Sequence, residues 1–302
     1  MIELGMTDEV AAALKAGRPV VALESTIVAH GFPRPDNLAV GQALEQAVRD
    51  GGAVPATIAV LDGRPRIGLT PDELQRLADA DDIVKVSTRD LPHLLAMGGN
   101  GATTVAATMV LAARAGIRVF ATGGIGGVHP AQPGHPPDVS ADLAELARTP
   151  VAVVCAGAKS ILDLPATLEM LETLGVPVIG YGTDEFPAFH ARESGLRVGQ
   201  RVDDAATMAA VLRAQDGLGL ACGTLVCNPP PVEAAVGRDM LAGWVTAALA
   251  EAQAQAIKGA KVTPFLLSAL DRLSEGRSKR INLALAKSNA SVAAAIAAAY
   301  CG

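Results

Sequence analysis

Apolar runs of strand length alternate with stretches of helical period along nearly the whole chain. Strands are predicted where apolar residues run almost without interruption, at 19–24, 56–61, 66–68, 82–87, 117–122, 151–155, 176–181 and 218–226. Helices are predicted where apolar residues recur with the helical period, at 7–15, 36–50, 102–115, 140–147, 160–174 and 203–214. Strands that alternate with helices form a mainly parallel sheet covered on both faces. We therefore predict an α/β fold, with three α/β/α layers around a mainly parallel central sheet.

The C-terminal region is predicted to be entirely helical. Its helices are expected at 239–256, 264–273 and 281–300. No linker, internal repeat or shift in composition separates this region from the rest of the chain. We predict a single domain over residues 1–302, with a helical C-terminal appendage from about residue 231.

Composition narrows the classes of function. Half of the 302 residues are hydrophobic but only 3% are aromatic, so the core is expected to consist of alanine, valine, leucine and isoleucine. A net charge of -6 argues against a nucleic-acid partner, which requires a basic face. We expect no membrane contact, because no basic leader precedes the fold and no apolar run approaches bilayer length. The four cysteines lack zinc or redox spacing, which favours a reducing, cytoplasmic location.

The strand at 151–155 leads directly to a single lysine, Lys159. Ligands of open α/β sheets bind outside the carboxyl ends of the strands. A lysine held there can be partly desolvated, which lowers its pKa and makes the neutral amine available as a nucleophile. The alternative is that Lys159 simply extends past the strand end into solvent.

Two other charged residues stand at the ends of predicted strands. Glu24 ends the strand at 19–24, where a carboxylate is either an acid/base with a raised pKa or a structural hydrogen-bond acceptor. Lys85 lies in the strand at 82–87, where alternation places it on a solvent face. Arg89 follows closely, so the two cations are also a plausible anion site.

Two glycine-containing segments suggest contacts with phosphate. The segment 100–105 enters a helix with a glycine and the hydroxyls of Thr103 and Thr104, and a helix N-terminus suits a phosphate group, although ordinary capping is the commoner use. The loop 123–127 lacks the third spaced glycine of a dinucleotide fingerprint, and the prolines from Pro130 onward prevent the required helix. We predict an active-site loop there and no dinucleotide.

Further polar candidates follow this loop. Asp138 and Asp142 flank Ser140 at the start of a predicted helix, where they either complement the helix dipole or, as one carboxylate with waters, hold Mn²⁺ or Mg²⁺. His129 and His135 lack a paired ligand spacing. Asn289 interrupts an alanine-rich helix and faces either solvent or the site.

Several sequence blocks together resemble a known family. They are 22–27, 85–92, 100–105, 120–129, 140–142, 155–160, 180–187, 263–267 and 288–290. These blocks resemble the pseudouridine-5′-phosphate glycosidase family and the related indigoidine-pathway proteins, over nearly the whole chain from about residue 18.

The resemblance implies reversible cleavage of the carbon–carbon glycosidic bond of pseudouridine 5′-phosphate, which gives uracil and ribose 5-phosphate. It implies Lys159 as the nucleophile, Glu24 as the proton donor and Asp138 as the ligand of one Mn²⁺ per subunit. It further implies a homotrimer. Substrate-binding residues are expected to be Lys85, Val105, Ser140, Ala141, Asp142 and Asn289. We add Arg89, Thr103 and Thr104 as expected phosphate contacts.

This chemistry agrees with the residues. A C-glycoside has no basic heteroatom at the anomeric link, so the two-carboxylate scheme of ordinary glycosidases is insufficient. A lysine that attacks the anomeric carbon opens the sugar and supplies an iminium electron sink, while Glu24 protonates the carbon of the base.

One departure keeps other functions open. The family commonly has arginine and glycine after the loop, whereas this chain has Pro130 and Ala131 followed by the proline-rich stretch 132–137. The alternatives are a related glycosidase or pigment-pathway enzyme that acts on another ribosyl phosphate, or a non-catalytic protein that binds a phosphorylated metabolite.

Overall fold

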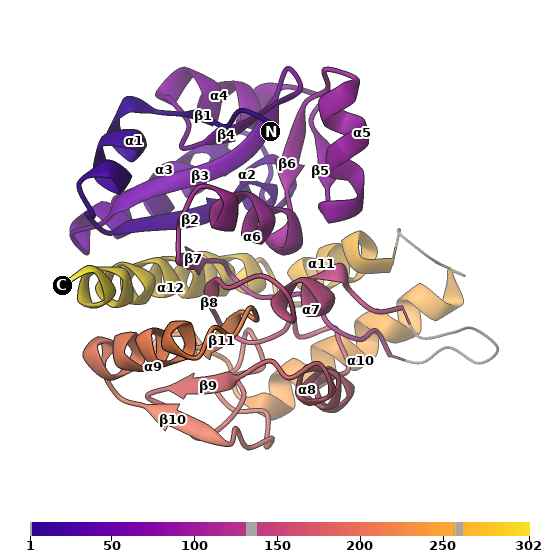
Figure 1. Cartoon of the computed structure of the whole chain (residues 1–302). Coiled ribbons are helices and arrows are strands. Elements are labelled where there is room, and N and C mark those ends of the chain that lie inside the picture. Colours follow the sequence, from indigo (N-terminus) through magenta and orange to yellow (C-terminus); the bar gives the residue numbers. More distant parts are fainter. Residues whose placement is uncertain (1, 131–137, 256, 258–261) are drawn as a thin grey trace.

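A single mixed sheet runs through the part of the chain that the computed structural model describes, which is residues 2–130, 138–255, 257 and 262–302 (Figure 1). Its main path has the order β1-β4-β3-β2-β7-β8-β11-β9-β10, and β5 and β6 join beside β3. All pairs are parallel except β3 with β4 and β3 with β6. The strands are β1 (Gly5–Met6), β2 (Val20–Glu24), β3 (Val54–Leu61), β4 (Arg64–Ile67), β5 (Val84–Val86), β6 (Gly101–Thr103), β7 (Val119–Ala121), β8 (Ala152–Cys155), β9 (Val178–Tyr181), β10 (Gln200–Val202) and β11 (Thr224–Cys227).

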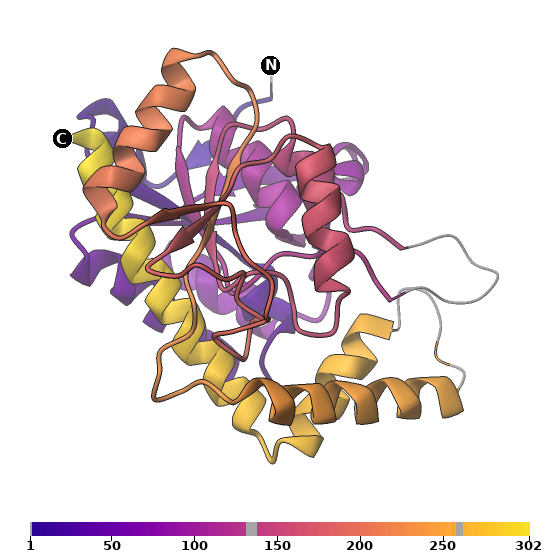
Figure 2. The same cartoon turned by 90° about the horizontal axis from the view of Figure 1, so that it is seen from below.

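Helices cover both faces of this sheet, so the predicted three-layer α/β/α arrangement is confirmed (Figures 1 and 2). One face carries α3, α9 and α12, of which α12 packs against both α3 and α9, and the other carries α1, α6, α7 and α8. The helices are α1 (Asp8–Lys15), α2 (Thr26–His30), α3 (Asp36–Asp50), α4 (Pro71–Asp79), α5 (Leu91–Ala96), α6 (Val105–Arg114), α7 (Ala141–Leu146), α8 (Leu164–Thr173), α9 (Ala205–Gly217), α10 (Arg238–Ala254), α11 (Val262–Leu273) and α12 (Arg277–Cys301).

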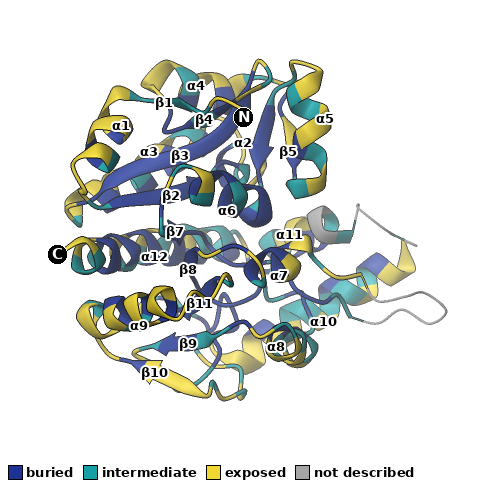
Figure 3. Cartoon of the chain, in the orientation of Figure 1, coloured by how far each residue is buried: buried dark blue, intermediate teal, exposed yellow. Residues whose placement is uncertain are grey.

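The alternation of side chains along each strand explains the two cores. In β2, Val21 and Leu23 pack with α3 and α12, whereas Val20 and Ala22 pack with α1 and α6. Both sets are buried, and the burial pattern shows strands enclosed between helices whose outer faces are exposed (Figure 3). Continuous apolar runs therefore do mark the central strands of a sheet that helices cover on both faces.

Helix α12 is longer than the predicted helix at 281–300 and reaches 25 residues. Among the described residues it is the one helix long and apolar enough to cross a bilayer, contrary to the expectation that no segment approaches that length. Half of its most apolar stretch is buried, and the helix packs against α3, α9, β7 and β8. The apolar composition of α12 is thus that of a core helix. The single-domain boundary stays a prediction.

Two predicted helices begin later than expected. The segment 102–115 starts with strand β6, because Gly101–Thr103 pairs with β3 and β5 before α6 begins at Val105. The segment 160–174 becomes helical only at Leu164, with Asp163 as the N-cap. Pro165 lies in the first turn of α8, where a missing N–H costs nothing, and so it does not interrupt the helix.

Candidate active site

Three neighbouring strands deliver the candidate residues to one edge of the sheet. Strand β2 ends at Glu24, β7 is followed by Thr122, and β8 leads to Lys159. Because β2, β7 and β8 are adjacent and parallel, their carboxyl ends lie side by side. Glu24 and Lys159 both line a pocket of about 700 Å³, together with Lys85 from β5. The structure thus brings together the three charged residues that sequence reasoning placed at strand ends.

Glu24 is held in a partly buried position by a hydroxyl. Its Oε1 accepts a hydrogen bond from the hydroxyl of Thr122, the residue that follows β7. Burial raises the pKa of the Glu24 carboxyl, against the opposing effects of the Lys159 charge and of the Thr122 hydrogen bond. A carboxyl with a raised pKa retains its proton to higher pH, which is a property of a general acid.

Lys85 is exposed at the edge of the pocket but faces charges within it. Desolvation lowers the pKa of Lys85 and the charge of Lys159 lowers it further, while Glu24 and Asp142 oppose the shift. These four groups therefore act on one another electrostatically. None of the ion pairs in the described part of the chain involves Glu24, Lys85 or Lys159, so their charges face the pocket without a partner at ion-pair distance.

The backbone of Lys159 is fixed between two segments. Its N–H donates to the carbonyl of Ile125 in the glycine loop at 3.1 Å, and its carbonyl accepts from the N–H of Leu162 at 3.0 Å. Lys159 itself is half-buried and lines the same wall of side chains as Glu24. Lys159 therefore lies at the pocket that also contains Glu24.

Asp142 joins three elements near the pocket. Its Oδ1 accepts from the N–H of Ala106 in α6 at 3.0 Å, and its Oδ2 accepts from the N–H of Gly126 at 2.8 Å. Ser140 caps α7 by accepting from the Asp142 N–H at 3.2 Å. Gly126 approaches so closely that a Cβ there would lie 2.3 Å from the Ser140 Oγ, so only glycine fits. Ala141 is exposed at the start of α7.

The start of α6 contains the predicted phosphate contacts. Thr103 is fully buried, and its hydroxyl donates to the carbonyl of Ile58 at 2.6 Å, so this side chain bonds within the protein. Thr104 is the N-cap, and its Oγ1 is buried without a hydrogen-bond partner among the described residues. The side chain of Val105 is buried. None of these three residues lines the pocket.

Asp138 lies in a different environment from Glu24. Its side chain is exposed, and its Oδ2 lies 4.0 Å from the Nε2 of His129. His129 is partly buried; desolvation lowers its pKa, the Asp138 charge opposes this shift, and the Lys159 charge adds to it. No group of three or more His, Cys, Asp or Glu side chains suited to a metal occurs in the described residues. His135 and the prolines of 131–137 lie outside those residues.

Two predicted contacts lie away from the pocket. The side chain of Arg89 is 90% exposed and pairs with Asp90 at 3.5 Å. Asn289 is fully buried: its Nδ2 donates to the carbonyl of Thr122 at 2.8 Å and its Oδ1 accepts from the Nδ2 of Asn228 at 2.9 Å. Asn289 therefore fixes the backbone beside Glu24 from the side of α12.

Sequence reasoning missed the pocket wall that α11 and α12 form. Asn282 lines this wall, and its Oδ1 is buried without a hydrogen-bond partner in the described part of the chain. Asn282 and Asn289 are seven residues apart and so share one face of α12, a spacing that marks this face in the sequence. The missed lining residues also include His30, Phe32, Phe189, His190, Asp271 and Lys279.

The fold and the site define an α/β protein with a lysine- and glutamate-lined pocket at the carboxyl edge of its sheet. The family described as indigoidine synthase A-like protein matches residues 9–299, and the chain belongs to this family. Proteins named pseudouridine-5′-phosphate glycosidase are similar over almost their full length. The Nocardioides protein is 55% identical, covering 99% of this chain and 97% of the relative, and the Deinococcus radiodurans protein is 54% identical, covering 98% and 95%.

Two solved structures have the same fold. The prealnumycin C-glycosynthase AlnA, solved in complex with ribulose 5-phosphate, has a TM-score of 0.92 and 42% identity, covering 99% of this chain and 97% of AlnA. An indigoidine synthase A-like protein from Thermotoga maritima has a TM-score of 0.88 and 36% identity, covering 98% and 96%. The agreement in fold confirms the predicted α/β class.

Proposed function

We propose that this protein is a pseudouridine-5′-phosphate glycosidase, which reversibly cleaves pseudouridine 5′-phosphate to uracil and ribose 5-phosphate. The observation that carries the proposal is the placement of Glu24, Lys85 and Lys159 around one pocket without ion-pair partners among the described residues. Relatives of this name, at 53–55% identity, support the same substrate. The AlnA likeness supports a phosphorylated five-carbon sugar and a C-glycosidic bond.

Lys159 would act as the nucleophile. Its amine attacks the anomeric carbon, a carbon–nitrogen bond forms, and the ring oxygen leaves with a proton as the sugar opens. The nitrogen lone pair then forms an iminium as the bond between sugar and base breaks. The electron pair of the broken bond stays on the base carbon, which takes up the proton that replaces the sugar. Water hydrolyses the iminium, which releases ribose 5-phosphate and regenerates Lys159.

Glu24 would deliver the proton to the base carbon. The carboxyl has a raised pKa because it is buried, and the Thr122 hydroxyl fixes its Oε1. General acid catalysis of this kind contributes about 10²- to 10⁴-fold to a rate. Asn282 lines the same pocket, where its side-chain amide suits hydrogen bonds to uracil.

The phosphate would bind next to the pocket, where α6 begins. A helix N-terminus carries a partial positive charge, and at α6 the Ala106 N–H is already bonded to Asp142 while the neighbouring N–H groups remain for a ligand. The unpartnered Oγ1 of Thr104 lies at this N-cap, and the cation of Lys85 is available nearby on β5, which pairs with β6. Val105 and the segment Ser140 to Asp142 are proposed to complete the sugar-phosphate contacts.

Asp138 would hold one Mn²⁺ ion, or Mg²⁺ in its place. A single exposed carboxylate fits a hard cation that keeps most of its waters and is completed by a phosphate-bearing substrate. The ion would supply positive charge beside the anionic sugar phosphate. We further propose a homotrimer in the cytoplasm, on the basis of the family likeness.

The decisive assay is release of uracil from pseudouridine 5′-phosphate, measured with added Mn²⁺ and after chelation. The proposal predicts turnover that falls on chelation, and uridine 5′-phosphate serves as the N-linked control. Turnover of an N-linked or other ribosyl phosphate in preference to pseudouridine 5′-phosphate would favour the related-glycosidase alternative. Tight binding of ribose 5-phosphate with no turnover of any ribosyl phosphate would indicate a non-catalytic binding protein.

A further inference from the structure

A buried histidine contacts the residue that follows Lys159. His190 lines the pocket but is only 3% exposed, and its Nδ1 lies 3.0 Å from the Oγ of Ser160. Neither side chain has a part in the proposed bond-breaking steps. The contact joins segments that are 30 residues apart in the chain.

The protonation state of this histidine sets the direction of the hydrogen bond. Burial lowers the pKa of His190 to about 4, against a hydrogen bond to the backbone of Ser278, so the ring is neutral near pH 7. A hydrogen bond that favours the protonated ring is one in which an imidazole N–H donates to a carbonyl. Since Nδ1 faces Ser160, we assign the ring proton to Nε2, so that Nδ1 accepts from the Ser160 hydroxyl.

The backbone holds His190 in this position at some conformational cost. The preceding Phe189 has φ of 63°, a left-handed conformation that a bulky residue rarely adopts. Its N–H donates to the carbonyl of Ala156 at 3.0 Å, and the carbonyl of His190 accepts from Val236 at 3.1 Å. A Cβ on Gly124 would lie 2.6 Å from the Phe189 ring, so the glycine loop packs directly on this turn.

We propose that His190 is a positioning residue that acts through Ser160 to aim the amine of Lys159. The backbone of Lys159 is already fixed at its N–H by Ile125 and at its carbonyl by Leu162. The Ser160–His190 hydrogen bond adds a third restraint on the same turn. This inference rests on the proposed role of Lys159 as nucleophile.

A positioning role predicts an effect on the covalent step and not on substrate affinity. The phosphate and base contacts proposed above do not involve Ser160 or His190. Displacement of a reacting group by about 1 Å can cost as much as 10²-fold in rate. Loss of the Ser160–His190 hydrogen bond should therefore slow formation of the lysine–sugar adduct by about 10-fold or more, with KM changed less than about twofold.

The experiment compares isosteric variants in the intact enzyme. Asparagine at 190 keeps an amide group near the Nδ1 position, whereas glutamine places its amide group near Nε2. We would measure KM, and the single-turnover rate of the borohydride-trapped adduct with ribose 5-phosphate, for Ser160→Ala, His190→Asn, His190→Gln and Ser160→Ala/His190→Gln. The matched control is Ser291→Ala, because among the described residues the exposed Ser291 hydroxyl bonds only the carbonyl of Lys287 on the same helix.

The expected pattern is specific. Ser160→Ala and His190→Gln lose about tenfold in adduct rate, His190→Asn stays within about threefold of wild type, and the double variant is no slower than its worse parent. The inference is overturned if Ser160→Ala forms adduct at the wild-type rate, if the two histidine variants fall equally, or if the two losses multiply. If His190→Gln does not fold, Ser160→Ala alone decides. A wild-type enzyme that releases uracil without forming any adduct refutes the covalent role of Lys159 itself.

Discussion

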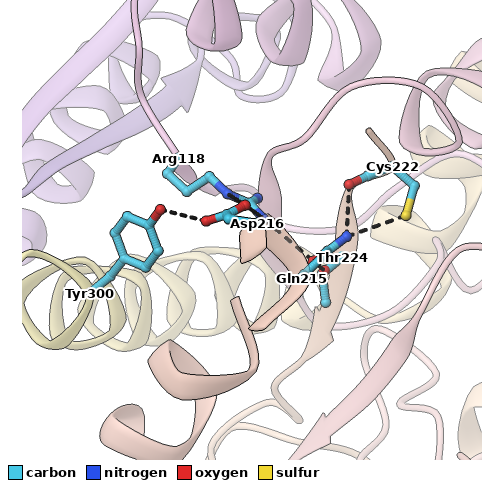
Figure 4. A network of polar contacts seen from close by, with 6 residues as sticks. All are labelled: Arg118, Gln215, Asp216, Cys222, Thr224 and Tyr300. Atoms are coloured by element: carbon cyan, nitrogen blue, oxygen red, sulfur yellow. Dashed lines mark hydrogen bonds and ion pairs between the residues drawn. The ribbon is translucent and has the colours of Figure 1, made fainter. Parts of the chain in front are cut away.

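Two polar clusters lie at opposite ends of the strands of the same sheet, here called its amino edge and its carboxyl edge. They differ in how their charges are paired. At the amino edge, Arg118 precedes β7 and pairs with Asp216 at 2.8 Å, and Asp216 also accepts from the hydroxyl of Tyr300 at 2.5 Å (Figure 4). At the carboxyl edge of the same strand, Thr122 bonds Glu24, while Lys85 and Lys159 have no ion-pair partner among the described residues.

The amino-edge network bonds mainly within itself, although the Nη1 of Arg118 is buried without a hydrogen-bond partner among the described residues. Gln215 accepts from the hydroxyl of Thr224 at 2.5 Å and donates to the carbonyl of Cys222 at 2.8 Å, beside the Arg118–Asp216 pair (Figure 4). This network joins α9, α12 and the starts of β7 and β11, and its polar groups mainly form hydrogen bonds with one another. The carboxyl-edge cluster instead leaves its charges available to a ligand. Charge pairing is therefore typical of the structural cluster, whereas unpaired charge that lines a pocket is typical of a reactive site.

The largest expected effect is loss of turnover on Lys159→Ala. Removal of the proposed nucleophile should reduce kcat by more than about 10³-fold, because Lys159 supplies the amine from which the iminium would form. The melting temperature should stay within about 2 °C of wild type, since Lys159 has no ion-pair partner among the described residues to lose. Steady-state uracil release and thermal unfolding measure the two quantities. Residual activity near the wild-type level would indicate an acid–base route.

Glu24→Gln should reduce kcat by about 10²- to 10⁴-fold while the Thr122 contact is kept by the amide oxygen. Because burial raises the Glu24 pKa, the folded protein binds this proton more tightly than the unfolded chain does. The wild type is therefore destabilised as pH rises through the raised pKa, and the variant is not. Urea unfolding from pH 4 to 9 should show the variant gaining relative stability toward alkaline pH. A stability difference that is independent of pH would contradict a raised pKa.

Disruption of the amino-edge network should have the opposite signature. Asp216→Ala leaves the partly buried Arg118 without its partner and should lower the free energy of unfolding by about 2 kcal/mol. The kcat of the folded fraction should be unchanged, because this edge is remote from the pocket. Urea unfolding and activity per folded molecule measure both. A selective loss of kcat at full stability would mean that the two edges are coupled.

The smallest effect is expected for Tyr300→Phe, which removes one hydrogen bond to Asp216 and leaves the ring. The free energy of unfolding should fall by about 1 kcal/mol, with no change in kcat or KM. The matched comparison is Tyr181→Phe, because no hydrogen bond of the Tyr181 hydroxyl is found in the described residues. Equal losses in the two variants would show that the Asp216 contact contributes nothing.

The sequence predicted the sheet and the three charged residues of the pocket, because buried parallel strands and the residues at their ends leave a local pattern. It did not predict that 101–103 forms strand β6, since this pairing depends on β3, far away in the chain. It also did not distinguish the role of Asn289, which supports the backbone, from that of Asn282, which lines the pocket. Both lie on one face of α12, and their roles depend on which segment that face meets.

The sequence also did not predict the hydrogen bond between His190 and Ser160. The two residues meet because Phe189 adopts a left-handed backbone conformation, which no local motif in the sequence predicts. In contrast, the capping box that Thr70 and Glu73 form at the start of α4 follows a local sequence motif, because all of its contacts lie within four consecutive residues.

The most direct test of this account is to trap the lysine–sugar adduct. The wild-type enzyme would be incubated with ribose 5-phosphate, reduced with borohydride and mapped by peptide mass spectrometry, with Lys159→Ala and Lys85→Ala treated in parallel. The account predicts one reduced sugar-phosphate adduct, located at Lys159, absent from Lys159→Ala and still present in Lys85→Ala. An active enzyme whose adduct is absent, or is located at Lys85, would contradict it.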